Sequence, residues 1–318
     1  MNIPTVNYQV LAKGNSDKSY DAEVACLAGA CSEWGFAYLA NMQRQELFSK
    51  MLEYSNSFFN LPEEEKRLLA TTRSEPANKN RYRGYFPLNP GSNSYKEGFE
   101  SGFQDYVLTG SGYIFDEPSV WPDADPAPGF RMFCRSYFQE MYEIGRIVLS
   151  AFEHHFKLPG GYFTEKFGNT LSTLRSLHYP ALEKCEDRSS LEFDQGTFFT
   201  TPSHTDSGII TLLLQDGNGG LQVRNKEYGW TDASVIEDAL VMNVGDLLER
   251  WTGGEFKATV HRLKAPTQSR YSVPFFLEPE GKALIEPFKE SSSFPPVTYE
   301  EYLSKKFAEF VEYQDAPA

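Results

Sequence analysis

Apolar residues recur with two different spacings, one typical of helices in the first half of the chain and one typical of strands in the second half. Before residue 160, apolar positions three or four apart predict helices that each bury one face, over residues 21–34, 48–59 and 130–156. Near the end of the chain, Thr298 and Glu301 match the capping-box pattern of a helix start, so a helix is predicted there as well.

After Gly160 the apolar residues form short or alternating runs, separated by glycine-rich turn sequences. Many short strands at such spacing are typical of a β-sandwich or barrel. The predicted strands cover residues 171–179, 209–214, 221–223, 239–244, 259–263 and 271–276, with another strand-like run at residues 3–10. Residues 71–125 are rich in Gly, Pro, Asn and Ser and are predicted to be loops.

This order of elements predicts a protein that is mainly β with surrounding helices. No linker-like stretch divides the chain, so one domain over residues 1–318 is expected. We expect an N-terminal helical jacket over about residues 1–165 around a β core at about residues 170–280, with a C-terminal helix at about residues 298–313.

The composition narrows the classes of partner. With 40% hydrophobic and 23% charged residues, the chain is globular rather than disordered. Its net charge is −14 and it has no block of Lys and Arg, so neither nucleic acid nor an anionic membrane surface is an expected partner. A small molecule is the expected partner.

The cysteines and the N-terminus indicate a reducing compartment. Cys26, Cys31, Cys134 and Cys185 show no CxxC spacing, and we interpret the first three as buried thiols on helices rather than as disulfides. There is no signal-peptide pattern, and no apolar run approaches about 18 residues. A cytoplasmic protein, expected to be a monomer, fits these features.

The first candidate for chemistry lies between Thr201 and Gln215. If the backbone is extended there, His204 and Asp206 project to the same side, because side chains two residues apart in a strand share a face. An imidazole and a carboxylate are two of the three ligands of a 2-His-1-carboxylate triad, which leaves positions open on non-haem Fe(II). Such a short pair also arises by chance, so a third ligand is needed.

His261 is the best candidate for that third ligand, since it lies in strand-like surroundings several strands later. A buried histidine bonded only to backbone is the alternative. His154 and His155 are neighbours near a helix end, where side chains diverge by about 100°, so they cannot chelate one ion together. They are interpreted as structural or exposed.

Arg270 and Ser272 would share a face of the next strand. A guanidinium and a hydroxyl together suit a carboxylate, because the guanidinium forms bidentate, charge-assisted hydrogen bonds. A surface arginine on an edge strand is the alternative, although an unpaired charge beside the apolar residues 273–277 would be costly. The sequence thus supplies three metal ligands and an anion clamp.

The loop Asn80–Pro87 carries candidates for substrate contact. It packs two arginines and two tyrosines around a glycine, and long loops with such residues are often ligand-facing. If the substrate is anionic, Arg81, Arg83 or both are expected to face it, with Tyr85 beside them. The alternative is that both arginines are merely solvated.

The chain resembles the Fe(II)- and 2-oxoglutarate-dependent dioxygenases of the isopenicillin N synthase-like superfamily. The matching stretches are Leu174–Pro180, His204–Asp206, Leu212–Asp216, Gly220–Val223, Val241–Arg250, His261–Arg262 and Arg270–Ser272. The N-terminal half matches more loosely, at Pro4–Val6, Trp34–Phe36, Phe58–Pro62, Arg83–Tyr85 and Lys96–Glu97. The resemblance implies a double-stranded β-helix, or jelly-roll, core.

The resemblance also implies roles for individual residues. His204, Asp206 and His261 would hold Fe(II), while Arg270 and Ser272 would bind the distal carboxylate of 2-oxoglutarate.

Three further positions on these strands correspond to positions discussed for the family. Tyr179 occupies the position of a tyrosine that also reaches this carboxylate, and Phe276 occupies one that often lines the substrate pocket. Leu177 departs from the asparagine that many members have there, so that contact is expected to be missing.

The implied reaction couples oxidative decarboxylation of 2-oxoglutarate, to succinate and CO2, with oxidation of a small molecule of specialised metabolism. O2 would be used through an Fe(IV)-oxo species for hydroxylation, desaturation or ring closure, with ascorbate as a reductant. Two alternatives stay open. One is a non-haem iron oxidase that does not use 2-oxoglutarate and binds its substrate carboxylate at Arg270 and Ser272; the other is a non-enzymatic metal-binding jelly-roll module.

Overall fold

Two antiparallel sheets form the centre of the molecule. A computed structural model of the chain describes residues 2–89, 91–123, 125–288 and 293–309. Within these residues the main sheet has eight strands in the order β1-β2-β11-β8-β13-β5-β4-β3, and the second sheet has five in the order β10-β9-β12-β7-β6. The pair β1–β2 is parallel, whereas the other neighbours run antiparallel.

The described strands belong to three sheets. The main sheet contains β1 (Thr5–Asn7), β2 (Phe36–Ala40), β3 (Gly84–Phe86), β4 (Glu97–Gly102), β5 (Thr173–Tyr179), β8 (Ile210–Gln215), β11 (Leu240–Val244) and β13 (Arg270–Leu277). The second sheet contains β6 (Glu192–Asp194), β7 (Thr197–His204), β9 (Leu221–Asn225), β10 (Gly229–Asp232) and β12 (His261–Lys264). A small third sheet pairs β14 (Leu284–Ile285) with β15 (Val297–Thr298).

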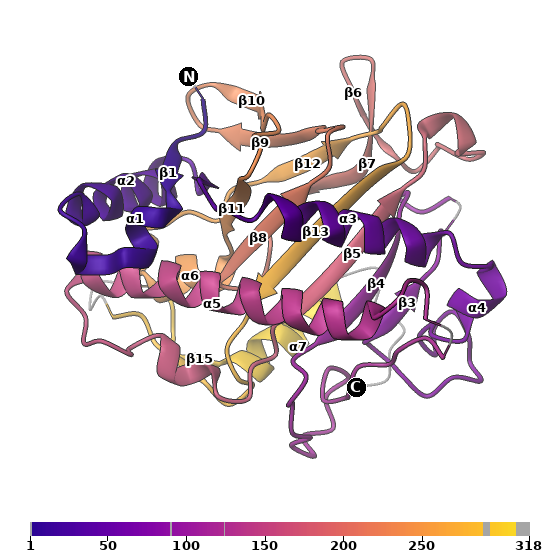
Figure 1. The fold of residues 1–318 in the computed structure, drawn as a ribbon, viewed down its shortest axis with the longest axis horizontal. Coiled ribbons are helices and arrows are strands. Elements are labelled where there is room, and N and C mark those ends of the chain that lie inside the picture. The colour runs from indigo at the N-terminus through magenta and orange to yellow at the C-terminus, as the bar shows by residue number, and fades with distance from the viewer. Residues whose placement is uncertain (1, 90, 124, 289–292, 310–318) are drawn as a thin grey trace.

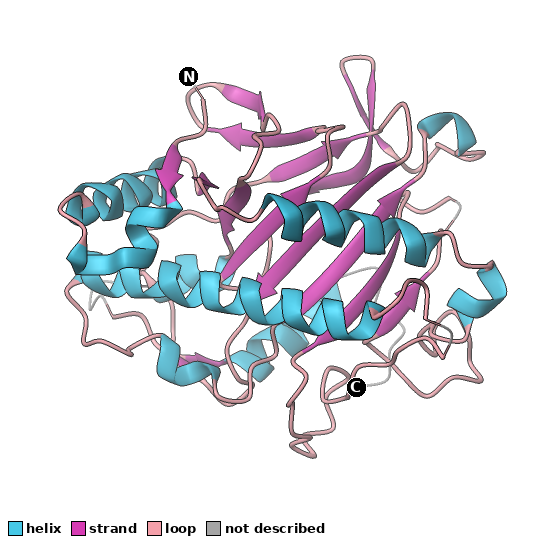
Figure 2. Ribbon diagram, viewed as in Figure 1, coloured by secondary structure: helices cyan, strands magenta, loops and turns pink. Residues whose placement is uncertain are grey.

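Helices cover the outer face of the main sheet. Figure 1 shows α3 and α5 lying across β8, β13 and β5, and Figure 2 shows further helices gathered beside the N-terminus. The helices are α1 (Tyr8–Lys13), α2 (Tyr20–Glu33), α3 (Gln45–Phe59), α4 (Glu63–Arg67), α5 (Phe130–Phe156), α6 (Asp246–Trp251) and α7 (Tyr299–Glu309). Short 3-10 turns lie at Gly14–Ser16, Thr164–Phe167 and Leu182–Lys184.

The apolar core lies mainly between these helices and the main sheet. On α5, Tyr137, Met141, Ile144 and Val148 are fully buried, as the apolar spacing predicts. A smaller buried cluster lies between the two sheets and includes residues of both, so the sheets pack against each other. The inner faces of the two sheets therefore form the space in which polar side chains could meet a ligand.

Most predicted elements are confirmed, with differences at particular places. The predicted helix 130–156 matches α5, and Thr298 and Glu301 form the reciprocal hydrogen bonds of a capping box. The helix expected at about residues 298–313 corresponds to α7, which ends at Glu309. Residues 310–313 lie outside the described residues.

Several expectations for the N-terminal part are wrong. The predicted strand 3–10 is only β1, followed directly by α1, and the predicted loop region 71–125 contains β3 and β4. The N-terminal jacket is therefore not only helical, since four of its strands join the main sheet. All four cysteines are free, but Cys26 is exposed and not buried, with its thiol directed at the Thr5 carbonyl.

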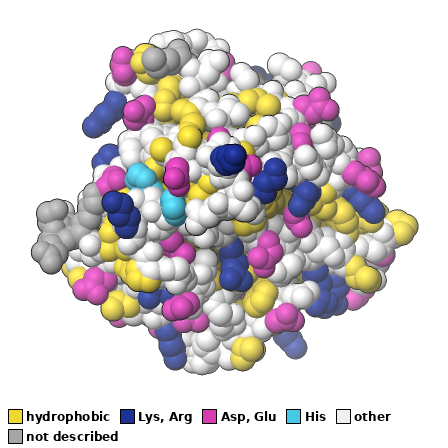
Figure 3. Space-filling view, turned by 60° about the vertical axis from the view of Figure 1, so that its left-hand side comes forward, with side chains coloured by type: hydrophobic (Ala, Val, Ile, Leu, Met, Phe, Trp, Pro, Cys, Tyr) yellow, Lys and Arg dark blue, Asp and Glu magenta, His cyan; other side chains and the backbone are white. Residues whose placement is uncertain are grey.

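Charged side chains of both signs cover the surface. On the face shown in Figure 3, basic and acidic residues alternate and do not gather in one patch of a single sign. In the described part of the chain, every helix is too short or too polar to cross a membrane.

Candidate metal centre and anion clamp

His204, Asp206 and His261 meet at one end of the second sheet. One donor atom from each lies within 4.8 Å of the other two. Each histidine Nε2 atom is 3.7 Å from Asp206 Oδ1, and the two rings are 4.2 Å apart between centroids. The three side chains singled out from the sequence are therefore brought together.

Strand pairing accounts for the two histidines. His204 ends β7 and His261 begins β12, and the two residues are direct partners in the register of these strands. Each ring is oriented by a backbone carbonyl, since Nδ1 of His204 lies 2.8 Å from Pro202 O and Nδ1 of His261 lies 3.1 Å from Thr259 O. A carbonyl can only accept, so Nδ1 carries the proton and Nε2 presents its lone pair to the centre.

Asp206 follows β7 in the loop before β8, rather than in the extended strand on which the sequence argument relied. Its Oδ2 atom accepts hydrogen bonds from Thr211 Oγ1 at 2.5 Å and Asn243 Nδ2 at 2.8 Å. Thr211 and Asn243 are paired on neighbouring strands, so the main sheet fixes the carboxylate. Oδ1 is thereby left to face the two imidazoles.

A glycine lets this loop pack closely. Gly245 precedes α6, and a Cβ atom there would lie 2.1 Å from the Gly208 carbonyl oxygen. The Asp246 amide donates to the Asp206 carbonyl at 2.7 Å, which ties the loop to the start of α6. Only a residue without a side chain permits this approach.

The charge states suit metal binding. Burial and the neighbouring His261 lower the pKa of His204 to about 3, so its imidazole is neutral. Although burial would raise the pKa of Asp206, the adjacent histidines and the bonds from Thr211 and Asn243 lower it. Two imidazoles and one carboxylate are the donor set of a non-haem Fe(II) site with open positions.

A second polar group lies deeper on the inner face of the main sheet. In the register of the main sheet, Arg270 is the partner of Tyr179, and Ser272 is the partner of both Leu177 and Gln215. Side chains of directly opposite residues lie on the same face of a sheet, so these side chains point to one side. Thr211 lies on the same face of β8 as Gln215, four residues earlier in the strand. Because Thr211 donates to Asp206, the carboxylate and Arg270 are linked to one face of the main sheet.

Arg270 carries a buried guanidinium on this inner face. It is 2% exposed, its Nε atom donates to Gly219 O at 2.6 Å, and its guanidinium carbon is 5.1 Å from the centre of the Tyr179 ring. Burial lowers its pKa from the ordinary value. Its Nη1 atom is shielded from water and has no hydrogen-bond partner among the described residues. A buried guanidinium donor of this kind fits a carboxylate ligand.

The neighbours of Arg270 lie on the same face of the main sheet. Ser272 is buried beside it, and the Tyr179 hydroxyl accepts a weak hydrogen bond from Thr201 at 3.4 Å. Leu177 adds only apolar surface, as its departure from asparagine predicts. Gln215, not singled out from the sequence, pairs with Ser272 and has a buried Oε1 atom that also lacks a partner among the described residues.

The loop residues predicted to face a substrate have other partners. The Arg81 side chain donates to the backbone carbonyls of Gly112 and Tyr113. Arg83 is 3% exposed and donates to Thr173 Oγ1 at 2.6 Å and to Leu171 O at 3.1 Å.

Tyr85 is likewise not brought to the site. Its hydroxyl donates to Glu97 at 2.5 Å on the outer face of the sheet, because Tyr85 has the opposite orientation to its inward neighbours Gly84 and Phe86.

Phe276, in contrast, lies on the inner face. It pairs with Thr211 on one side and with Thr173 on the other. Beside it lies Arg175, which the sequence argument missed, with its guanidinium carbon 4.9 Å from the Phe276 ring and 5.7 Å from the Phe86 ring. Arg175 Nε donates to Glu100 Oε1 at 2.5 Å.

A sequence signal for Arg175 did exist. It stands four residues before Tyr179 on β5, so the two-residue period of a strand puts both on one face. The Arg175 side chain is 23% exposed and that of its partner Glu100 is 1% exposed, so the arginine is the accessible member of this pair.

Comparison with known proteins identifies the family. Residues 172–279 match the model of the 2OG-Fe(II) oxygenase superfamily, and residues 3–124 match that of the non-haem dioxygenase in morphine synthesis N-terminal region. The 2-oxoglutarate-dependent dioxygenase gloF of Glarea lozoyensis is 30% identical, over 91% of this chain and 92% of that protein. The proline hydroxylase buaE of Petromyces alliaceus is 31% identical, over 81% and 82%.

A solved structure shows the same architecture. A full-length protein of Neurospora crassa, in complex with alpha-KG and thymine, superimposes with a TM-score of 0.80 at 27% identity, over 96% of each chain. The expected double-stranded β-helix core is thereby confirmed, and the alternative of a non-enzymatic metal-binding module is set aside. The chain belongs to the 2OG-Fe(II) oxygenase superfamily and is an isopenicillin N synthase-like Fe(II)/2-oxoglutarate-dependent dioxygenase that oxidises a small molecule.

Proposed function

We propose that His204, Asp206 and His261 hold the Fe(II) and that Arg270 binds the distal carboxylate of 2-oxoglutarate, assisted by Ser272 and Tyr179. The observation that carries this proposal is the Nη1 atom of Arg270, a buried donor without a partner among the described residues. It lies on the same inner face as the Asp206 support, in keeping with a dicarboxylic acid that spans from the clamp to the metal.

Within this proposal, the bound iron supplies activation of O2, driven by decarboxylation of 2-oxoglutarate to succinate and CO2. The surrounding protein residues hold and orient the three metal ligands. Carbonyls at residues 202 and 259 fix the imidazole rings, and Thr211 and Asn243 hold the carboxylate so that one oxygen faces the metal.

Arg270 has the complementary role at the far end of the cosubstrate. By holding one carboxylate, it directs the 2-oxo acid end toward the metal, and the buried apolar residues around Arg270 keep water from this end of the site. Oxidation of a substrate C–H bond is the step common to hydroxylation, desaturation and ring closure. Ascorbate is the proposed reductant that keeps the iron in its ferrous state.

We further propose that the substrate lies against Phe276 and contacts Arg175. The arginine is held between the rings of Phe86 and Phe276, which favours a flat substrate that stacks on an aromatic ring and offers a carbonyl oxygen as acceptor. Gly98 supports this arrangement, because a Cβ there would lie 2.0 Å from the Phe86 ring.

An uncharged substrate suits this site better than an anion. The charge of Arg175 is already balanced by Glu100, and a second buried carboxyl, Glu278, acts electrostatically on the same cluster. Arg83 belongs to this cluster as well, because its charge and that of Arg175 both act on Glu278 and its guanidinium donates to Thr173, the strand partner of Phe276. Contact of Arg81 or Arg83 with the substrate stays a prediction. The Neurospora crassa relative, described in complex with thymine, offers one precedent for a flat, uncharged ligand in this family.

The test is succinate release from 2-oxoglutarate by the Fe(II)-loaded enzyme in air. We expect iron-dependent succinate release that thymine or uracil stimulates and orotate, their anionic relative, does not. Arg175→Gln should remove the stimulation, whereas Arg224→Gln, an exposed arginine on β9, should keep it. If the wild-type enzyme releases no succinate, the proposed cosubstrate role of Arg270 is wrong; if orotate stimulates more than thymine, the proposed substrate class is wrong.

We also propose that the described chain works as one domain, since the main apolar cluster joins helices of the N-terminal part to strands of the β core. The monomeric state and the cytoplasmic location stay predictions.

A further inference from the structure

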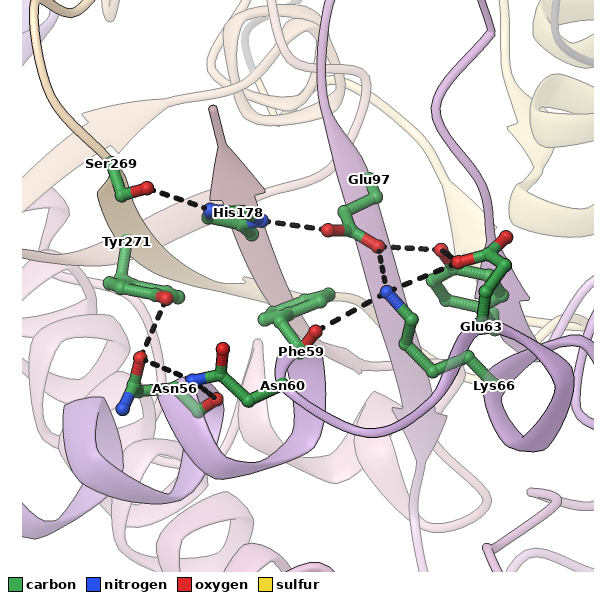
Figure 4. Close-up of polar contacts among 10 residues, drawn as sticks. Asn56, Phe59, Asn60, Glu63, Lys66, Glu97, His178, Ser269 and Tyr271 are labelled. Carbon is green, nitrogen blue, oxygen red and sulfur yellow. Dashed lines mark hydrogen bonds and ion pairs between the residues drawn. The ribbon is translucent and has the colours of Figure 1, made fainter. Parts of the chain in front are cut away.

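A buried polar network lies on the outer face of the main sheet, directly behind the Arg270 clamp (Figure 4). His178 of β5 is its centre, with Nδ1 2.7 Å from Glu97 Oε1 and Nε2 3.4 Å from Ser269 Oγ. The second oxygen of Glu97 accepts from Lys66 Nζ at 2.8 Å and from the Tyr85 hydroxyl at 2.5 Å. The network thus joins α4, β3, β4, β5 and the residue before β13.

The centre of the network is buried, whereas Ser269 at its edge is exposed. The side chains of Glu97, Lys66 and His178 are 5%, 7% and 15% exposed. Burial alone would raise the pKa of Glu97, but hydrogen bonds from His178, Lys66 and Tyr85 lower it below its ordinary value. The ionised carboxylate is therefore a fixed anchor to which His178 is bound.

His178 contacts both residues that flank Arg270. It meets Ser269 through Nε2, and its ring stacks on Tyr271 with centroids 5.0 Å apart and planes 18° from parallel. In the register of β5 and β13, Tyr271 is the partner of His178 and Arg270 is the partner of Tyr179. The backbone that carries Arg270 is therefore held from behind by His178, while its guanidinium points to the inner face.

Other contacts on the outer face support the same strand. The Tyr271 hydroxyl donates to Asn56 Oδ1 of α3 at 2.7 Å, and Phe59 packs against both rings. On the inner side, the described residues give the Arg270 side chain one hydrogen bond, to Gly219 O. With few bonds of its own, the guanidinium depends on the placement of its backbone for its position.

We propose that His178 is a positioning residue for the cosubstrate clamp. Held by Glu97, it fixes Ser269 and Tyr271 and thereby sets the place of the Arg270 guanidinium and the affinity for the distal carboxylate of 2-oxoglutarate. This inference rests on the proposed role of Arg270. It predicts an effect confined to ligands that have that carboxylate.

The experiment compares two ligands of the Mn(II)-loaded protein by calorimetry without turnover. One is 2-oxoglutarate, and the other is 2-oxopentanoate, which has the same 2-oxo acid end and no distal carboxylate. His178→Leu should weaken 2-oxoglutarate binding roughly tenfold and change 2-oxopentanoate binding by less than about twofold, because only the clamp is displaced.

Two further variants make the result specific. His178→Asn keeps a donor near the position of Nδ1 for Glu97, and it should restore 2-oxoglutarate binding to within about threefold of wild type. His154→Leu removes another histidine bound to a carboxylate, at the far end of α5, and should change neither ligand.

The outcomes separate this inference from the proposed function. If the wild-type protein shows no preference for 2-oxoglutarate over 2-oxopentanoate, the proposed role of Arg270 in binding the distal carboxylate is wrong. A wild-type preference that survives in His178→Leu would overturn only the role of His178. Equal weakening of both ligands in His178→Leu would also overturn it, since that indicates general damage rather than positioning.

Discussion

Replacing Arg270 by methionine should weaken 2-oxoglutarate binding strongly without destabilising the ligand-free protein. Arg270 is 2% exposed and makes a single hydrogen bond, to Gly219, while Nη1 has no partner among the described residues. A buried cation with an unsatisfied donor costs free energy, and an apolar side chain of similar length relieves that cost. The residue therefore contributes to ligand binding at the expense of stability.

The magnitude follows from the hydrogen bonds expected with ligand. Two charge-assisted bonds from the guanidinium to the distal carboxylate contribute about 1.5–3 kcal/mol each, so about 3–6 kcal/mol is lost in Arg270→Met. Since about 1.4 kcal/mol corresponds to a factor of ten, the dissociation constant of 2-oxoglutarate should rise roughly 10²–10⁴-fold. The free energy of unfolding without ligand should fall by less than about 1 kcal/mol, or rise.

Calorimetry of the Mn(II)-loaded protein and urea unfolding of the ligand-free protein measure the two quantities. Arg262→Met is the matched control, because Arg262 is also buried but binds Glu192 at 2.7 Å and Asp194 at 2.9 Å. These carboxylates are 26% and 39% exposed and can be hydrated, so Arg262→Met should lose about 1–3 kcal/mol of unfolding free energy. Its preference for 2-oxoglutarate over 2-oxopentanoate should remain.

Two results would refute this reasoning about Arg270. One is a loss of unfolding free energy in Arg270→Met as large as that in Arg262→Met, which would make Arg270 a structural residue. The other is an equal loss of affinity for 2-oxoglutarate and 2-oxopentanoate, which would mean that the guanidinium does not bind the distal carboxylate.

Two further predictions concern the supports of the site. Gly245→Ala should lower the free energy of unfolding by more than about 2 kcal/mol and weaken Mn(II) binding, because its Cβ would lie 2.1 Å from the Gly208 carbonyl oxygen. The control is Gly29→Ala, which has open space around it and should change neither quantity. Similar melting curves for the two variants would contradict the predicted steric clash at Gly245. Burial raises the pKa of Glu278 from 4.5 to about 7, so the folded state holds more protons than the unfolded state between these values and the free energy of unfolding should fall as the pH rises through them. The loss amounts to at most about 3 kcal/mol, and Glu278→Gln should remove most of it; parallel pH profiles of unfolding for wild type and variant would contradict the raised pKa.

The residues that could be predicted from the sequence are those with short spacing or a shared strand face. His204 with Asp206, and Arg270 with Ser272, are pairs two residues apart, and such pairs are readable without knowing the tertiary structure. The sequence distinguishes His261 from His154 and His155, which are neighbours on a helix, but His178 also lies in a strand with polar neighbours, so strand surroundings alone do not single out His261. The long amphipathic helix α5 is predictable to the residue because its apolar stripe persists over many turns.

The contacts that the sequence does not reveal depend on partners far away along the chain. Glu117 accepts hydrogen bonds from the backbone amides of Arg81 and Arg83, and the contact of these arginines with a substrate stays a prediction. Strand β4 is not predicted because Glu97 and Glu100 look exposed in the sequence. Both are buried by pairing with residues from other elements, Lys66 and Arg175 among them.

The most direct test of the proposed site is a crystal structure of the protein with Fe(II) and 2-oxoglutarate, grown without oxygen. We predict one ion bound by Nε2 of His204, Oδ1 of Asp206 and Nε2 of His261, each at about 2.0–2.2 Å, with the distal carboxylate on Nη1 of Arg270. An ion held by other residues, or a 2-oxoglutarate carboxylate that does not touch Arg270, would contradict it.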